Sequence, residues 1–345
     1  MPIPETARTG RSRRQRVAAL LGIALSFGLL FWALRGVHLG EVARHIREAR
    51  PLPMAAAVFV ATLTFPLRLL RWRLLLRAED GGPLPRAPLW HAIAIGFMAN
   101  NVLPFRAGEL VRTFAATRLS GARFSSVISS IAVERIFDGL TVVGLLAAAL
   151  LASDLPDGVT VGNVSVARVA QVTGAMAAAA LVGAILVVAF PVAAERLVRR
   201  VLPSGKLTDR VVALIEGVRH GLTVLRSPAR LVGVMGWSLV LWLTNAWAFH
   251  IGFQAFSIPV DYAGALLLQG ILIFGISVQL TPGFVGQFEA AIVAALALYG
   301  ISNDLASSYA IAFHGLTFIP IVLLGAWSLA RTPVALSDLR QPGND

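Results

Sequence analysis

The sequence predicts an all-α protein that crosses a membrane several times, with about six full spans, two re-entrant broken hairpins and an inverted-topology repeat. Three observations lead to this class. Charged residues make up only 14% of the 345 residues and hydrophobic residues 57%, whereas about 25% of a soluble domain is charged. Several apolar runs reach the roughly 20 residues that a helix needs to cross a bilayer. The basic residues gather between these runs, as the positive-inside rule describes for cytoplasmic loops.

The first repeat, residues 17–152, is expected to start from the cytoplasm. Several arginines in the tail 1–16 precede an apolar run over 17–34, which is too long for a signal peptide and has no small-residue cleavage site. An amphipathic outer segment over 35–50 follows, and a second span over about 53–76 returns. The arginines that place the end of this span and the next loop in the cytoplasm are Arg68, Arg71, Arg73, Arg77 and Arg86.

The next apolar stretch, 88–119, is interrupted at Pro104. If both of its pieces crossed the membrane fully, the later loop 153–163 would lie in the cytoplasm, although it contains two Asp and no Lys or Arg. The positive-inside rule therefore favours a re-entrant hairpin that breaks at Pro104 and returns to the same side. The span over 124–152 then leads outward.

The second repeat, residues 167–330, is expected to run in the opposite sense. A span over 167–192 returns to the segment 193–230, which is rich in arginine and therefore cytoplasmic. Within it, polar and apolar positions over 207–226 have the helical spacing of an interfacial amphipathic helix. The span over 231–256 then leads outward again.

A second hairpin is predicted over 262–300. This apolar unit is interrupted at 279–289, and neither of the short segments that flank it contains Lys or Arg. Both ends therefore belong outside, and the hairpin enters from the side opposite to the first. The last span, 305–330, returns to a cytoplasmic tail, 331–345.

The two halves share one order of elements: two spans, a hairpin broken at proline, and one further span. In both breaks a glycine follows the proline by four positions and a glutamate comes soon after. Inverted repeats of this kind place broken half-helices around a substrate site near the bilayer midplane. The matching residues are Pro104, Gly108 and Glu109 in the first break and Pro282, Gly286 and Glu289 in the second.

The first break is expected to attract anions. Pro104 removes a backbone donor and Gly108 relaxes the chain, so NH groups at the start of the second half-helix point at the break. Arg106, Glu109 and Arg112 follow at i, i+3 and i+6 and form one polar stripe with a net positive charge. Such charges cost about 2.5–3.5 kcal/mol each at the bilayer centre, so they usually face a cavity or one another.

Acidic partners for these arginines are expected from the span that follows. Glu134 and Asp138 share a helical face at i, i+4, and Arg135 is within reach of Asp138. Polar residues also follow the second break, and His314 lies in the last span. The candidate substrate-binding residues are Asn101, Pro104, Arg106, Gly108, Glu109, Arg112, Glu134, Arg135, Asp138, Thr281, Pro282, Gly283, Gly286, Gln287, Glu289 and His314.

Structural interpretations of these residues stay open beside the functional one. The charged side chains can form an ion network that only ties the first hairpin to the next span, and the Pro-Gly breaks can be simple kinks. His314 can be a hydrogen-bonded packing residue. The six His residues are widely spaced and Cys is absent, so we expect no metal and no cofactor. A membrane-embedded enzyme stays open as a less favoured alternative, in which the fold would bring Glu134, Asp138 and His314 together. The charge of +12 belongs to cytoplasmic loops and does not indicate nucleic-acid binding.

Three motifs resemble one known family over nearly the whole chain. N-x-L-P-x-R-x-G-E-x-x-R at 101–112, E-R-x-x-D at 134–138 and P-G-x-x-G-x-x-E at 282–289 are similar to the lysylphosphatidylglycerol synthase transmembrane region, the flippase-like domain of multiple peptide resistance factors. The resemblance implies a protein that moves lipids between leaflets or supports a lipid-linked envelope pathway. In two-domain relatives a soluble domain performs aminoacyl transfer. This chain ends fifteen residues after its last predicted span, so we expect that reaction not to be its own.

The leading hypothesis is a lipid translocase, not an enzyme, in the cytoplasmic membrane of a bacterium or archaeon, with both termini inside. Arg106, Arg112 and the half-helix terminus would bind the phosphate of an anionic or aminoacylated phospholipid, while Glu109, Glu134 and Asp138 balance charge or carry protons. One alternative substrate is a polyprenyl phosphate or a lipid-linked sugar carrier. Another alternative is a scaffold without transport, which docks a glycosyltransferase or an aminoacyl-lipid synthase through its basic cytoplasmic segment.

Overall fold

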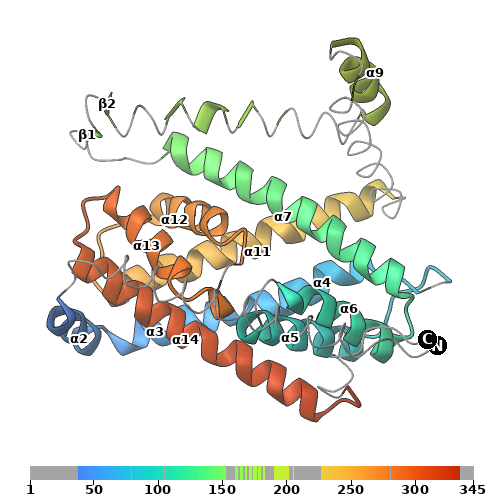
Figure 1. Cartoon of the computed structure of the whole chain (residues 1–345), viewed down its shortest axis with the longest axis horizontal. Helices are drawn as coiled ribbons and strands as arrows, with labels where there is room; N and C mark the ends of the chain where they lie inside the picture. Colours follow the sequence, from blue (N-terminus) through green and yellow to red (C-terminus); the bar gives the residue numbers. More distant parts are fainter. Residues whose placement is uncertain are drawn as a thin grey trace, which may run out of the picture.

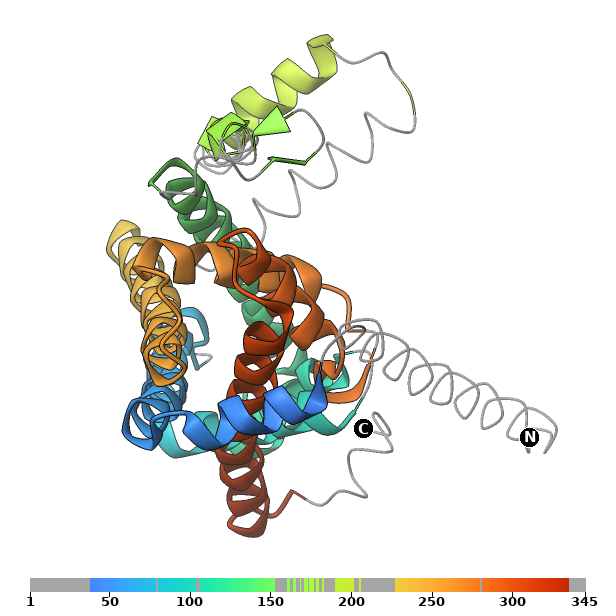
Figure 2. The ribbon, with the colours of Figure 1, turned by 90° about the vertical axis from the view of Figure 1, so that its left-hand side faces the viewer.

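The computed structural model describes residues 38–78, 80–103, 106–152, 227–279 and 281–334, together with pieces of 160–205. The described chain is helical apart from a minimal hairpin of two two-residue strands, β1 (Thr160–Val161) and β2 (Val164–Ser165). Helix α9 (Pro191–Val201) and this hairpin lie to one side of the main helical body (Figures 1 and 2). The first predicted span, most of the span over 167–192, the segment 207–226 and Pro104 lie outside the described residues.

Within the described residues, four helical segments are long and apolar enough to cross a membrane, and they correspond to four of the predicted spans. The chain is therefore a multi-pass membrane protein. The first segment is divided at Leu63, because Pro66 lacks the NH group that would bond to the carbonyl oxygen of Thr62. The four segments are α3 (Pro51–Thr62) with α4 (Thr64–Leu75), α7 (Phe124–Ala152), α11 (Pro228–Ala255) and α14 (Asn303–Ala330).

Each predicted hairpin consists of two shorter helices that pack against one another (Figure 1). The first pair is α5 (Arg86–Val102) and α6 (Ala107–Ser120). The second pair is α12 (Tyr262–Gly275) and α13 (Gln287–Ala297), with a short 3-10 turn, η1 (Pro282–Phe284), between them.

The glycines of the two breaks have different roles. A Cβ atom on Gly108 would lie 2.1 Å from the carbonyl oxygen of Gly96, so this glycine allows α5 and α6 to approach closely. It does not relax the chain as predicted, because its φ is not positive. Gly283 and Gly286 in the second break do need glycine, with φ of 60° and 84°.

Two apolar cores surround the two hairpins. One core packs α4 against α5, α6 and α7 and contains Phe65 and Trp72. The other packs α3, α11 and α14 against α12 and α13 and contains Phe253 and Tyr309. The amphipathic helix α2 (Leu39–Glu48) lies against α14, where the backbone NH preceding it bonds to a carboxylate of α14 (Figure 2).

Candidate functional site

The breaks of the two hairpins contact one another through Gln279. This side chain is only 2% exposed. Its Nε2 donates to the carbonyl oxygens of Asn100, at 2.7 Å, and Leu103, at 3.0 Å, and its Oε1 accepts from the backbone NH of Arg106 at 2.8 Å. One amide group therefore satisfies three backbone groups that the interrupted helix leaves without partners. The sequence analysis did not include Gln279 among the site residues.

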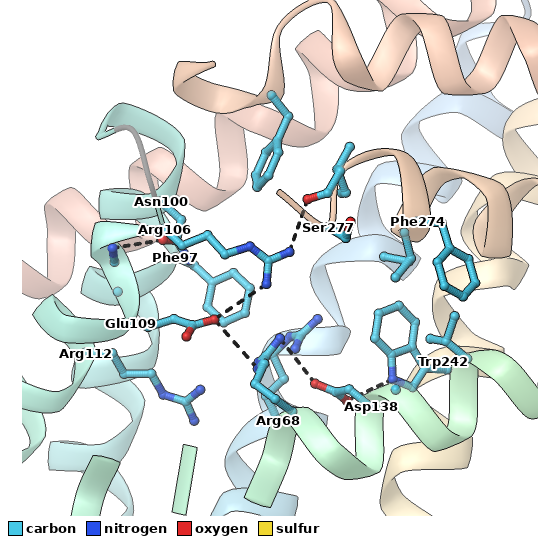
Figure 3. A pocket seen from close by; sticks show the side chains of 18 of the residues that line it. Arg68, Phe97, Asn100, Arg106, Glu109, Arg112, Asp138, Trp242, Phe274 and Ser277 are labelled. Carbon is cyan, nitrogen blue, oxygen red and sulfur yellow. Dashed lines mark hydrogen bonds and ion pairs between the residues drawn. The ribbon is translucent and has the colours of Figure 1, made fainter. Parts of the chain in front are cut away.

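Arg106 links the same two breaks through its guanidinium group. Its backbone adopts the left-handed conformation, with φ 52° and ψ 30°, which is uncommon for a residue with a Cβ atom. Its Nη2 donates to the carbonyl oxygen of Ile276 at 3.1 Å, and its Nη1 lies 3.9 Å from Glu109. The side chain extends from the first hairpin across a pocket toward the second (Figure 3). The strained backbone thus aims a cation into the space between the hairpins.

Glu134 on α7 is the centre of a buried ion cluster. It accepts two hydrogen bonds of 3.0 Å from Arg112, one to each carboxylate oxygen. Nitrogen atoms of Arg71 and Arg135 lie 3.1 Å and 2.8 Å from Oε1. The guanidinium of Arg112 also lies 3.7 Å from the ring centre of Trp72. Both terminal nitrogens of the Arg112 guanidinium are therefore bonded to Glu134.

Asp138, one turn further along α7, extends the cluster to α11. Its carboxylate accepts from Arg71 at 2.5 Å and from the indole NH of Trp242 at 2.9 Å, and it lies 3.4 Å from Arg135. Arg71 also donates to the hydroxyl of Ser238 at 3.0 Å. Arg71 is fully buried and belongs to this cluster, and the cytoplasmic position of the end of its span stays a prediction. Arg71 lies on the inner face of α4, where carboxylate partners compensate its buried charge.

A pocket of about 480 Å³ lies between the hairpins and beside this cluster (Figure 3). Helices α4, α5, α6, α7, α11 and α12 and the turn η1 all contribute to it. Of the predicted site residues it is lined by Asn101, Arg106, Gly108, Glu109, Arg112, Arg135 and Asp138. Lining residues that the sequence analysis missed include Arg68, Phe97, Asn100, Trp242, Phe274 and Ser277.

Arg68 is the pocket arginine with the fewest partners. Its guanidinium lies over the ring of Phe97, 4.5 Å from the ring centre, and within the described part of the chain it makes no hydrogen bond or ion pair. Glu109 is the half-exposed carboxylate of the lining. Its Oε1 lies 3.9 Å from Arg106 and 3.8 Å from Arg135, beyond hydrogen-bond distance.

The charges around the pocket do not cancel. Five arginines stand against three carboxylates in the pocket lining and the buried cluster behind it, which leaves a formal charge of +2. Such a charge at membrane depth is costly unless a ligand or water compensates it. The arginines are Arg68, Arg71, Arg106, Arg112 and Arg135, and the carboxylates are Glu109, Glu134 and Asp138.

The backbone at the start of α6 does not form the expected anion site. The NH of Arg106 bonds to Gln279, that of Gly108 to Oδ1 of Asn100 at 2.9 Å, and that of Glu109 to the carbonyl oxygen of Arg106 at 3.1 Å. Protein acceptors therefore occupy these three donors. The guanidinium groups are the positively charged groups that remain in the pocket lining.

The predicted residues of the second break shape that break and do not line the pocket. Thr281 donates to the carbonyl oxygen of Val285 at 2.9 Å, and Gln287 donates to that of Val278 at 2.9 Å. The hydroxyl or amide groups of these residues thus replace missing helical bonds. The predicted residues outside the lining are Thr281, Pro282, Gly283, Gly286, Gln287, Glu289 and His314, along with Glu134 in the first half.

Glu289 and His314 form a buried pair that holds the start of α13. One carboxylate oxygen of Glu289 accepts the NH of Gly286 at 2.7 Å, and the other lies 2.6 Å from Nδ1 of His314. The imidazole stacks on Phe288 with ring centres 4.2 Å apart. No group of three metal-binding side chains is found in the described ranges. The packing interpretation of His314 therefore fits this geometry.

Comparison with known proteins identifies the family. The family model for the lysylphosphatidylglycerol synthase TM region matches residues 19–325. A protein named glycosyltransferase AglD from Haloferax volcanii is 28% identical over an alignment of 351 residues, gaps included. The alignment covers 94% of this chain and 56% of that protein. This chain thus spans about half the length of that relative. A UPF0104 membrane protein from Methanothermobacter thermautotrophicus is 25% identical over 315 residues, with 89% and 90% of the two chains covered. The chain belongs to the family of the lysylphosphatidylglycerol synthase transmembrane region.

Proposed function

We propose that this protein moves an anionic lipid between the leaflets of a cell membrane and binds the lipid phosphate in the pocket between its two hairpins. The observation that supports this most strongly is the uncompensated positive charge of that pocket. Guanidinium groups bind phosphate oxygens with strong, directional hydrogen bonds. Arg68 and Arg106 have free donors that face the pocket, and they are the groups to which we assign phosphate binding.

The lining also suits the lipid chain. Besides the arginines, the pocket is lined by aromatic and aliphatic side chains from α5, α7 and α12. Phe274 is 54% exposed, so an acyl or prenyl chain can pass over it from the pocket toward the surrounding lipid. Pockets of a few hundred Å³ with few polar groups in an apolar wall are typical ligand sites.

The meeting of the two breaks supports movement as well as binding. In transporters with inverted repeats, the substrate site lies where broken helices from the two halves meet, and one half rocks against the other. Here Gln279 and the Arg106–Ile276 hydrogen bond are contacts between the halves that such rocking has to break. The re-entrant topology of both hairpins is part of this proposal.

The ion cluster has a different role in the proposal. Arg112 and Arg71 form short ion pairs with Glu134 through their terminal guanidinium nitrogens, so we assign these three residues to holding α4, α6 and α7 in place. Glu109 is half-exposed in the pocket. It is the carboxylate we assign to adjusting the pocket charge during transport.

A second candidate function is support for a glycosyltransferase. It is favoured by the relative named glycosyltransferase AglD, because this chain matches only part of that protein. In this alternative the pocket holds a lipid-linked substrate for a partner enzyme, which docks on the basic segment 193–230, and no lipid crosses the membrane.

Leaflet exchange in liposomes separates the two functions. The purified protein is reconstituted with headgroup-labelled zwitterionic, anionic and aminoacylated lipids, and Arg106→Gln is compared with Arg118→Gln. Arg118 lies in the last turn of α6, is exposed and does not line the pocket. We expect exchange of anionic lipid that Arg106→Gln lowers at least about tenfold and Arg118→Gln leaves unchanged. Folded protein that exchanges no lipid would overturn the proposal and favour the docking function.

A further inference from the structure

We infer that the pocket takes a lipid whose phosphate end carries two negative charges, such as a phosphomonoester or a diphosphate on a lipid chain, and that it discriminates against aminoacylated phospholipids. This inference rests on the proposed function, because it names the substrate class of the same pocket. It follows from which charged groups of the lining are already used by the protein and which are free.

The two buried carboxylates cannot serve a cationic headgroup. The oxygens of Glu134 are occupied by Arg71, Arg112 and Arg135 at distances between 2.8 and 3.1 Å. Those of Asp138 are occupied by Arg71, Arg135 and the indole NH of Trp242. An ammonium group in the pocket would have to displace an arginine that is itself buried.

Glu109, the loosely paired carboxylate of the lining, lies near two guanidinium groups. Glu109 lies 3.8–3.9 Å from two guanidinium groups, those of Arg106 and Arg135. A lysyl headgroup brings two ammonium groups into the same space and meets four arginines of the lining, with Glu109 as the one carboxylate there that is not already hydrogen-bonded by the protein. Like charges brought together in such a site repel strongly, because the low dielectric constant weakens screening.

Apart from the carboxylate of Glu109 and the hydroxyl of Ser277, the free polar groups of the lining are hydrogen-bond donors. Arg68 makes no hydrogen bond within the described residues, and Nε of Arg106 is also without a partner. The side-chain oxygen of Asn100 is occupied by the NH of Gly108, which directs the amide NH2 group away from that bond. Asn101 adds a second amide. Donors of this kind match phosphate oxygens, which only accept.

The size of the uncompensated charge indicates the charge of the ligand. The pocket and its cluster carry a formal +2, so a phosphodiester with one negative charge leaves half of it unbalanced. A phosphomonoester or diphosphate can balance it fully. The apolar wall that contains Phe97 and Phe274 (Figure 3) favours such a group on a lipid over the free anion.

Native mass spectrometry of the full chain in detergent tests this ranking directly. The protein is incubated at about pH 8, where a phosphomonoester has lost its second proton, with phosphatidate, phosphatidylglycerol or lysyl-phosphatidylglycerol of identical acyl chains. Inorganic pyrophosphate is added as a competitor in a further arm. We expect phosphatidate to bind at least about tenfold more tightly than phosphatidylglycerol, and lysyl-phosphatidylglycerol to bind most weakly.

Variants locate the preference in the pocket. Arg68→Gln and Arg106→Gln should each reduce the preference for phosphatidate severalfold, while Arg68→Lys should retain part of it and Arg118→Gln all of it. Equal binding of phosphatidate and phosphatidylglycerol, or strongest binding of lysyl-phosphatidylglycerol, overturns the inference and leaves the proposed function standing. Pyrophosphate that competes as well as phosphatidate overturns the lipid assignment. Folded protein that binds none of the lipids overturns the proposed function itself.

Discussion

Replacing Glu134 with Gln should destabilise the protein strongly, because this buried carboxylate holds three guanidinium groups from three helices. It receives two hydrogen bonds of 3.0 Å from Arg112 and lies 3.1 Å and 2.8 Å from nitrogen atoms of Arg71 and Arg135. Removing one partner of a buried ion pair costs about 3–5 kcal/mol, since the other charge remains buried without compensation. Arg112 loses the carboxylate that binds it, whereas Arg71 and Arg135 keep Asp138 as a partner, so we expect a loss of at least about 3 kcal/mol in the free energy of unfolding.

A double variant separates the ion pair from the packing around it. Arg112→Gln together with Glu134→Gln removes both charges of the bidentate pair and leaves two amides that can bond to one another. The double variant should be less destabilised than the sum of the single variants, by about 1–3 kcal/mol. Arg118→Gln, at an exposed position of the same helix α6, should change stability by less than about 0.5 kcal/mol.

The assay is denaturant unfolding in one detergent, followed by tryptophan fluorescence for the unmodified protein, the two single variants, the double variant and Arg118→Gln. A loss below about 1 kcal/mol for Glu134→Gln, or strict additivity in the double variant, would refute the reasoning that this carboxylate ties α4 and α6 to α7.

Three further predictions test the helix contacts, the link between the hairpins and the topology. Gly108→Ala should unfold the first hairpin or sharply lower the thermal midpoint of the protein, because the new Cβ would lie 2.1 Å from the carbonyl oxygen of Gly96. The control Gly236→Ala places its Cβ where no atom lies within 4 Å, so it should be neutral in the same melting assay. Gln279→Leu should retain the side-chain volume but leave three backbone groups at the break without partners, so the rate of lipid exchange should change. The control Gln254→Leu, at an exposed position of α11, should leave that rate unchanged. The chain lacks Cys, so single Cys residues can be labelled from either side of the membrane. Substitutions at Gly81 and Gly205 should label from the cytoplasm and those at Gly158 and Ser302 from outside, and cytoplasmic labelling at Gly158 would contradict the re-entrant hairpin.

The long spans could be predicted from the sequence because their signal is local. Continuous apolar runs of sufficient length, ended by arginines or by turn residues, place α7, α11 and α14 within a few residues of their observed bounds. The breaks at residues 103–106 and 279–286 were also predictable, since proline and glycine interrupt apolar helices. The lysylphosphatidylglycerol synthase family was recognisable from the motifs around these breaks, and the family model confirms it.

The inner face of α4 could not be predicted in the same way. Arg68 and Arg71 belong to a run of arginines that looks like a cytoplasmic helix end, and only the packing of α4 against α7 and α11 shows that Arg71 is buried with Asp138. The i, i+3 spacing of the two arginines is the signal that was available, because it places both on one face of the helix.

The glutamates of the two breaks show why matching motifs do not imply matching roles. Glu109 is half-exposed beside arginines in the pocket. Glu289 is buried, accepts the NH of Gly286 and pairs with His314. The difference depends on the residues across from each break, which come from distant parts of the chain. The matching proline, glycine and glutamate positions thus predicted where the chain breaks, but not which of the two breaks provides the charged lining of the pocket.

An experimental structure of the full chain in lipid nanodiscs that contain phosphatidate would test whether Arg68 and Arg106 bind a lipid phosphate. We expect density for the phosphate between these two guanidinium groups, with the lipid chain passing Phe97 and Phe274 toward the bilayer. A pocket without lipid density under these conditions, or a phosphate bound only at other arginines, would contradict this assignment.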